Sequence, residues 1–170
     1  MNIEPQNYPL PQTIVGLDPG SKTIGVARMC LRTQTIVCRS IPWADDPRTM
    51  TDRIVAAIGI ERPALVVVEH QFQHGFNIVS VAQAAGALAW WARTTWPGVP
   101  LAWQLPKEAR KLTGCGQTKA DVLPWVLAGG HAGLVIDHPG EDPKKHGDAH
   151  DAAVLAAAGA VLARHNGWIH

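Results

Sequence analysis

The chain of 170 residues has few cysteines, few charged side chains and no long apolar run. Its cysteines, Cys30, Cys38 and Cys115, form no CxxC pair, which excludes a zinc ribbon and a thioredoxin-like redox site. No stretch of about 18 apolar residues is present, so we expect no membrane span. The first residues lack the basic and apolar segments of a signal peptide. We therefore expect a cytoplasmic protein with free thiols.

Charge of either sign is also scarce. Charged residues make up 17% of the chain, against roughly 25% in typical soluble domains. The 15 Lys and Arg and 14 Asp and Glu give a formal net charge of +1, whereas nucleic-acid binders are usually basic. Apolar residues make up 46%, which is enough for a packed core without disulfides. We expect a flexible leader over residues 1–12 and a single domain over 13–170.

The hydrophobic pattern predicts an alternating series of strands and helices. Strands are expected over residues 13–18, 23–30, 35–41, 65–68 and 99–103. Helices are expected over residues 47–60, 77–95, 107–111, 119–127 and 148–165, with a loop over 129–147. The continuous apolar run at 65–68 is typical of a central strand buried on both faces. The order predicts an α/β protein of ribonuclease-H-like architecture, a mixed five-stranded sheet flanked by helices on both faces.

Two carboxylates stand where apolar strands end. Asp18 ends the run that begins at Thr13, and Glu69 follows the run at residues 65–68. A carboxylate at the end of a buried strand is costly unless it is hydrogen-bonded or binds a cation. If the two strands are neighbours, the carboxylates lie side by side and repel each other unless a cation lies between them.

Two more acids begin the last predicted helix. Asp148 and Asp151 are three residues apart and share a helix face. Each alone can equally be a helix cap, because carboxylates stabilise a first helical turn. Together with Asp18 and Glu69 they make an all-oxygen ligand set that favours Mg²⁺ or Mn²⁺ over zinc. Four carboxylates can hold two such ions about 4 Å apart, an arrangement suited to in-line hydrolysis of a phosphodiester.

Four segments of the chain carry motifs in a defined order. They are GLDPGSKTIGVA at 16–27, VEHQF at 68–72, LTGCGQTK at 112–119 and GDAHDAAVL at 147–155. Together they resemble the RuvC family of Holliday junction resolvases over most of residues 13–163. The resemblance implies a dimeric endonuclease that acts on branched DNA with Mg²⁺, or Mn²⁺, two ions per site, and with no small-molecule cofactor. It makes Asp18, Glu69, Asp148 and Asp151 the catalytic metal ligands.

The resemblance also implies residues that contact DNA. Lys119 matches the basic residue beside the scissile phosphate, and Lys111 matches an upstream basic position. Lys107 and Arg110 extend this basic run, which forms a phosphate track if it lies beside the metal site, although a solvated helix face looks the same. Phe72 matches the aromatic residue that stacks on unpaired bases at the junction centre, and it can also be a core residue.

Other features leave alternatives open. His150 stands between the two helix acids, where small or apolar residues are usual in the family, and with His146 it is a candidate further metal ligand. Only one of Trp90 and Trp91 can face the core, since neighbours on a helix point about 100° apart, and the other is a candidate dimer contact.

Two other functions are compatible with the sequence: a YqgF-like nuclease acting on structured RNA, and a non-catalytic module that binds branched DNA. Short relatives of the RuvC type occur in phages and prophages, where branch specificity is often broader.

Setting the four acids aside leaves 15 basic and 10 acidic residues, a net charge of +5 for the rest of the chain. The near-neutral total therefore does not exclude DNA as a partner.

Overall fold

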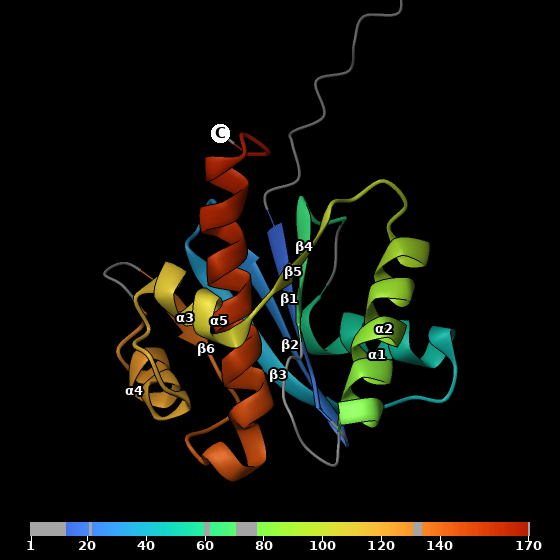
Figure 1. Ribbon diagram of the computed structural model, residues 1–170, viewed down its shortest axis with the longest axis horizontal. Coiled ribbons are helices and arrows are strands. Elements are labelled where there is room, and N and C mark those ends of the chain that lie inside the picture. Colours follow the sequence, from blue (N-terminus) through green and yellow to red (C-terminus); the bar gives the residue numbers. More distant parts are fainter. Residues whose placement is uncertain (1–12, 21, 60–61, 71–77, 131–133, 170) are drawn as a thin grey trace, which may run out of the picture.

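The computed structural model describes residues 13–20, 22–59, 62–70, 78–130 and 134–169, which form a sheet between two layers of helices (Figure 1). The strands are β1 (Thr13–Pro19), β2 (Thr23–Cys30), β3 (Thr35–Pro42), β4 (Leu65–Glu69), β5 (Leu101–Gln104) and β6 (Val135–Asp137). The helices are α1 (Pro47–Ile58), α2 (Ile78–Thr95), α3 (Pro106–Thr113), the short 3-10 helix η1 (Lys119–Asp121), α4 (Val122–Leu127) and α5 (Pro143–His165). The leader predicted over residues 1–12 lies outside the described residues.

The sheet is mixed, as predicted, with the strand order β5-β4-β1-β2-β3-β6. β1, β2 and β3 form an antiparallel meander. β4 pairs in parallel with β1, and β5 extends the sheet in parallel beyond β4. This arrangement makes β1 and β4 neighbours, so the residues that end them lie at the same edge of the sheet.

The predicted number of five strands is wrong, because β6 adds a sixth strand beside β3. It lies within residues 129–147, which the sequence predicts to be a loop. The strand has three residues, and Val135 is 63% exposed. Its last residue, Asp137, forms an ion pair with Arg39 of β3 at 2.7 Å. A strand this short and this exposed needs no apolar pattern, so the sequence carries little sign of it.

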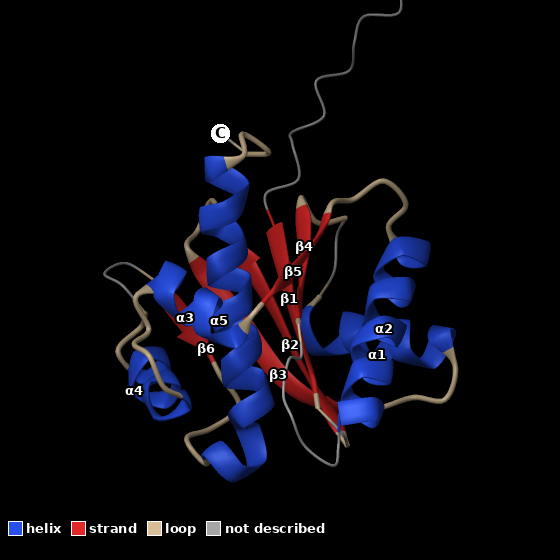
Figure 2. Cartoon of the chain, in the orientation of Figure 1, coloured by secondary structure: helices blue, strands red, loops and turns tan. Residues whose placement is uncertain are grey.

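Helices cover both faces of the sheet, as predicted. α1 and α2 lie on one face, and α5 lies on the other with α3 and α4 (Figure 2). Val66 and Val68 of β4 pack into the core beneath α1 and α2, whereas Leu65 and Val67 pack into the core beneath α5. β4 is therefore the central strand buried on both faces that its continuous apolar run indicates. Across the described ranges, no helix is both long and apolar enough to cross a membrane.

The last helix begins earlier than predicted. Asp142 is its N-cap and accepts a hydrogen bond from the backbone N–H of Lys144 at 2.9 Å, and Pro143 occupies the first turn. The expected start at residue 148 is wrong, and so is the alternative that Asp148 and Asp151 cap the helix. Both acids lie inside α5, so the capping of this helix does not account for them.

Glycines let α5 lie close against the sheet. A Cβ atom at Gly16 of β1 would lie 2.4 Å from the carbonyl oxygen of Ala152. A Cβ atom at Gly25 of β2 would lie 1.8 Å from the carbonyl oxygen of Asp148. Only residues without a side chain allow the backbone of the helix to approach two strands this closely. The approach brings the acids of α5 to the edge where β1 and β4 end.

Candidate active site

The first two predicted acids lie side by side at the ends of β1 and β4. In the parallel pairing of these strands Leu17 lies opposite Val68, so the next residues, Asp18 and Glu69, are neighbours. Both side chains point to the face that α5 covers, because Gly16 contacts α5 and Val67 packs beneath it. Asp18 is 6% exposed and Glu69 is 7% exposed. The sheet thus holds two carboxylates nearly out of water.

The third and fourth acids come from α5. Asp151 is buried, with 9% of its surface exposed, and Asp148 is partly exposed. The hydroxyl group of Thr23 on β2 donates a hydrogen bond to Oδ2 of Asp148 at 2.5 Å. The structure therefore brings all four predicted carboxylates to one edge of the sheet, and it adds Thr23, which sequence reasoning did not single out.

Burial and neighbouring charges shift the pKa of Asp18 and the pKa of Glu69. Burial raises the pKa of Asp18 well above its usual range, and the negative charges of the other three carboxylates raise it further. Burial also raises the pKa of Glu69 to about 7, with a further contribution from Asp151, while Lys119 and a hydrogen bond from Asp18 act in the opposite direction. Buried carboxyl groups whose pKa is raised by neighbouring negative charges lack enough positive charge nearby to compensate them.

Lys119 is the basic residue that lies nearest this cluster. Its Nζ is 2.9 Å from Oδ2 of Asp151. η1 presents this side chain, and the turn before η1 is built around Asp121. Oδ2 of Asp121 accepts hydrogen bonds from the backbone N–H groups of Gln117 and Thr118 and from the Thr118 hydroxyl. The glycine-bearing turn of the sequence motif therefore places the basic residue beside the acids.

The residues fit a divalent cation in their chemistry. The donors are all carboxylate oxygens, which suit Mg²⁺ or Mn²⁺, and the raised pKa values of Asp18 and Glu69 indicate uncompensated negative charge. Within the described ranges, no three acidic, histidine or cysteine side chains form a group close enough to hold a metal ion as they stand. Binding of a cation would therefore require the carboxylates to draw together.

Three histidines of this region, including the two candidate ligands, have different surroundings from the acids. His150 is 1% exposed, and its Nε2 lies 3.0 Å from the carbonyl oxygen of Gly140. The ring of His138 packs edge-on against it, with ring centroids 5.8 Å apart. His146 also lies beside Gly140, since a Cβ atom at Gly140 would be 3.2 Å from the ring of His146. These contacts give His150 a structural role in holding the segment before α5 against the helix.

The predicted DNA-contacting residues divide into three groups. Arg110 lines the same small hollow as Glu69 and Asp151, and its charge acts to lower the pKa of Glu69. Lys107 and Lys111 lie on α3 and are exposed. Phe72 lies outside the described residues. The basic run therefore has one member, Arg110, that joins Lys119 at the carboxylates.

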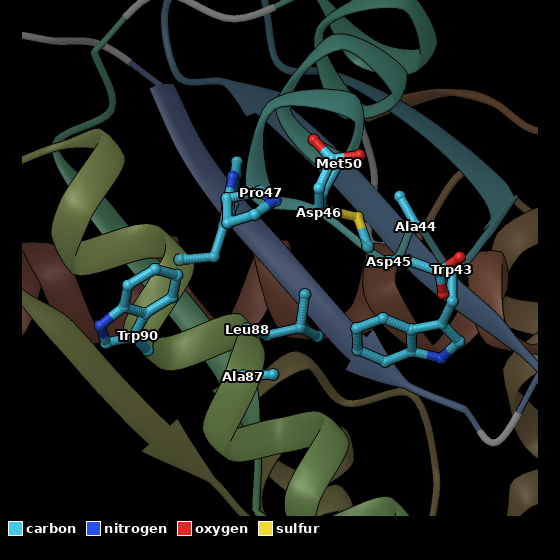
Figure 3. Close-up of a pocket in the computed structure, with 10 residues that line it drawn as sticks. Trp43, Ala44, Asp45, Asp46, Pro47, Met50, Ala87, Leu88 and Trp90 are labelled. Carbon is cyan, nitrogen blue, oxygen red and sulfur yellow. The ribbon is translucent and has the colours of Figure 1, made fainter.

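A second hollow, of about 200 Å³, lies on the other face of the sheet between α2 and the start of α1. Figure 3 shows Leu88 between Trp90 on one side and Trp43 on the other. Trp90 is 57% exposed, whereas its neighbour Trp91 is 3% exposed and donates a hydrogen bond to the hydroxyl of Thr51. The prediction that only one of the paired tryptophans faces the core is confirmed.

Comparisons with known proteins find likeness in structure and none in sequence. No model of a protein family matches the chain, and no curated protein matches it. Thermus thermophilus RuvC, solved in complex with a Holliday junction substrate, superposes with a TM-score of 0.62 at 20% identity, covering 91% of this chain and 96% of that one. A second structure of Thermus thermophilus RuvC superposes with a TM-score of 0.61 at 21% identity, again covering 91% of this chain and 96% of that one.

A Fowlpox virus resolvase in complex with Holliday junction DNA gives a TM-score of 0.47 at 12% identity, over 93% of this chain and 99% of that one. The two superpositions on RuvC span nearly the whole of both proteins. The expected ribonuclease-H-like architecture is confirmed. The chain has the fold of RuvC.

Proposed function

We propose that the protein is a structure-selective endonuclease that resolves Holliday junctions and related branched DNA by metal-dependent phosphodiester hydrolysis. The observation that carries the proposal is the gathering of four carboxylates and Lys119 at one edge of a RuvC-like sheet. Asp18 and Glu69 are held nearly out of water there, at a cost to folding that a structural role does not repay. Burial of this kind is typical of sites that bind a cation or perform catalysis.

The four acids Asp18, Glu69, Asp148 and Asp151 would hold the metal, which we propose to be two Mg²⁺ or Mn²⁺ ions. Bound there, the ions would supply activation of the attacking water and stabilisation of the leaving oxygen.

Lys119 extends from η1 to Asp151 with 72% of its side chain exposed, so its ammonium group can also meet a phosphate from solvent. Arg110 adds a second positive charge beside Glu69. Lys107 and Lys111, exposed on α3, continue the basic surface away from the carboxylates. A phosphate backbone bound along this surface would be attracted by charge and directed to the acids. Phe72 remains a proposed stacking residue from the sequence motif alone.

We also propose that the protein acts as a homodimer. Trp90 is 57% exposed on α2, beside the hollow that Met50 and Leu88 help to line. Large exposed aromatic side chains are enriched at protein interfaces, and a symmetric dimer would offer two sites to the two strands of a junction. Trp90→Ser should leave the monomer folded and lower the mass measured by light scattering from dimer to monomer. An unchanged mass would show that Trp90 does not contribute to a dimer interface.

The test of function is a cleavage assay with Mg²⁺ on four substrates: a four-way DNA junction, a replication fork, a linear duplex and a structured RNA. We expect cleavage of the branched DNAs and little of the duplex or the RNA. Cleavage of the RNA alone would favour the YqgF-like alternative. Tight binding of the junction without cleavage in either Mg²⁺ or Mn²⁺ would favour a non-catalytic binding module.

A further inference from the structure

Thr23 makes a contact to the candidate metal site that the sequence motifs do not assign. It begins β2, and its hydroxyl donates to Oδ2 of Asp148 at 2.5 Å, across 125 residues of chain. Asp18 of β1 pairs with Gly25 of β2, and Thr23 precedes Gly25 by two residues, so Thr23 and Gly25 point to the same face of the sheet. The hydroxyl group therefore faces α5 beside the carboxylates rather than the core beneath α1 and α2.

The surroundings of Asp148 fit this contact closely. A Cβ atom at Gly20 would lie 2.8 Å from Oδ2 of Asp148, so the absence of a side chain there leaves room for the carboxylate. Gly20 is itself held in place, because Nε1 of Trp43 donates a hydrogen bond to its carbonyl oxygen at 2.9 Å. Gly20 thus limits where Oδ2 of Asp148 can lie, and the hydroxyl group of Thr23 donates a hydrogen bond to that oxygen.

The two acids of α5 are held in different ways. Asp151 is paired with a cation, the ammonium group of Lys119. Asp148 is held by a neutral hydroxyl group. A neutral donor orients a carboxylate without adding a positive charge of its own. The hydrogen bond from Thr23 is made to Oδ2 and does not use Oδ1.

We infer that Thr23 is a positioning residue that orients the carboxylate of Asp148 as a metal ligand, an inference that rests on the function proposed above. Partners of metal ligands commonly act in this way, and their loss weakens metal affinity by about 10- to 100-fold. Docking of α5 on β2 does not depend on this bond, because the buried Ala149, Ala152 and Ala156 pack against the sheet and Gly25 receives the helix backbone.

The experiment measures binding of Mn²⁺ by calorimetry, without DNA, to the full chain and to three variants. Thr23→Val removes the hydroxyl and keeps the shape. Thr23→Ser keeps the hydroxyl. Thr35→Val is the matched control, because Thr35 begins β3 and its hydroxyl group also hydrogen-bonds a side chain, that of Thr33 at 2.7 Å. Thermal unfolding in EDTA is recorded for every variant to detect a purely structural loss.

We expect Thr23→Val to bind Mn²⁺ about tenfold more weakly than the wild type, while Thr23→Ser and Thr35→Val bind as the wild type does. In EDTA, the unfolding temperature of Thr23→Val should be close to that of Thr35→Val. Wild-type affinity in Thr23→Val, or an equal loss in Thr23→Ser, would overturn the role of Thr23 and leave the proposed function standing. Absence of Mn²⁺ binding by the wild type would overturn both.

Discussion

Replacing Glu69 with glutamine removes a charge that the folded protein holds only at a cost. The side chain is 7% exposed, and burial together with Asp151 raises its pKa from an ordinary 4.5 to about 7. Each tenfold change in proton affinity corresponds to about 1.4 kcal/mol, so ionising Glu69 in the folded chain costs about 3 kcal/mol. Glutamine has the same shape and can still accept the hydrogen bond from Asp18.

The sign of the pH dependence follows from whether the folded or the unfolded chain binds the proton of Glu69 more tightly. A carboxyl group with a raised pKa in the folded state keeps its proton to higher pH there than in the unfolded chain. Its contribution to stability is therefore lost as pH rises from about 4.5, the unfolded pKa, to about 7, the folded pKa. In EDTA at about pH 8, Glu69→Gln should be more stable than the wild type by about 3 kcal/mol, and at about pH 4 the two should be equal.

Urea denaturation followed by tryptophan fluorescence measures this difference, with the buried Trp91 as one reporter. Glu141→Gln is the matched control, because Glu141 is exposed and its replacement should change stability little at either pH. Adding Mg²⁺ should stabilise the wild type more than Glu69→Gln, since a ligand of the folded state stabilises it by mass action. An equal gain at both pH values, or no gain at the higher one, would refute the reasoning.

Two further predictions concern how α5 is held. Gly25→Ala places a Cβ against the carbonyl oxygen of Asp148 and should lower the free energy of unfolding by about 3 kcal/mol or more, measured by urea denaturation; wild-type stability would show that α5 is not held by this close approach. His150→Ala removes a buried ring and its bond to Gly140 and should cost about 2 kcal/mol; if it instead abolished Mn²⁺ binding without loss of stability, His150 would be a ligand.

That the carboxylates gather can be expected from the sequence, because the reason for it is physical. Asp18 and Glu69 follow runs of buried apolar residues, and an acid in that position needs a partner or a cation wherever the strands lie. The pairing of β1 with β4, which makes them neighbours, is left as a condition by the sequence and is shown by the structure. Asp148 and Asp151 share a face at any register of a helix that includes both, so an error in the start of α5 did not separate them.

The misjudged boundary of α5 has a local cause. Asp142 and Pro143 form a standard helix start, an acidic N-cap followed by proline in the first turn. Gly147 follows within the first two turns, and glycine disfavours a helix interior, so the segment has the composition of a loop. The packing of α5 on Gly16 and Gly25 outweighs that preference.

Thr23 and Arg110 illustrate what a linear pattern conceals. The β-branched side chain of threonine is enough to account for it at the start of a strand. Only the structure shows that the hydroxyl group of Thr23 donates a hydrogen bond to Asp148. Arg110 belongs to a basic run with Lys107 and Lys111, and the sequence does not distinguish its members. The direction of α3 turns Arg110 toward Glu69 and leaves the two lysines exposed.

We propose that the clustered acids perform the cleavage of branched DNA. The most direct measurement compares Asp18→Asn with Asp52→Asn, a control on the exposed surface of α1, in Mg²⁺-dependent cleavage and in binding of a four-way junction. We expect Asp18→Asn to lose cleavage by at least about 1,000-fold while its affinity for the junction stays near that of the wild type, and Asp52→Asn to retain both. Cleavage by Asp18→Asn at the wild-type rate would contradict it.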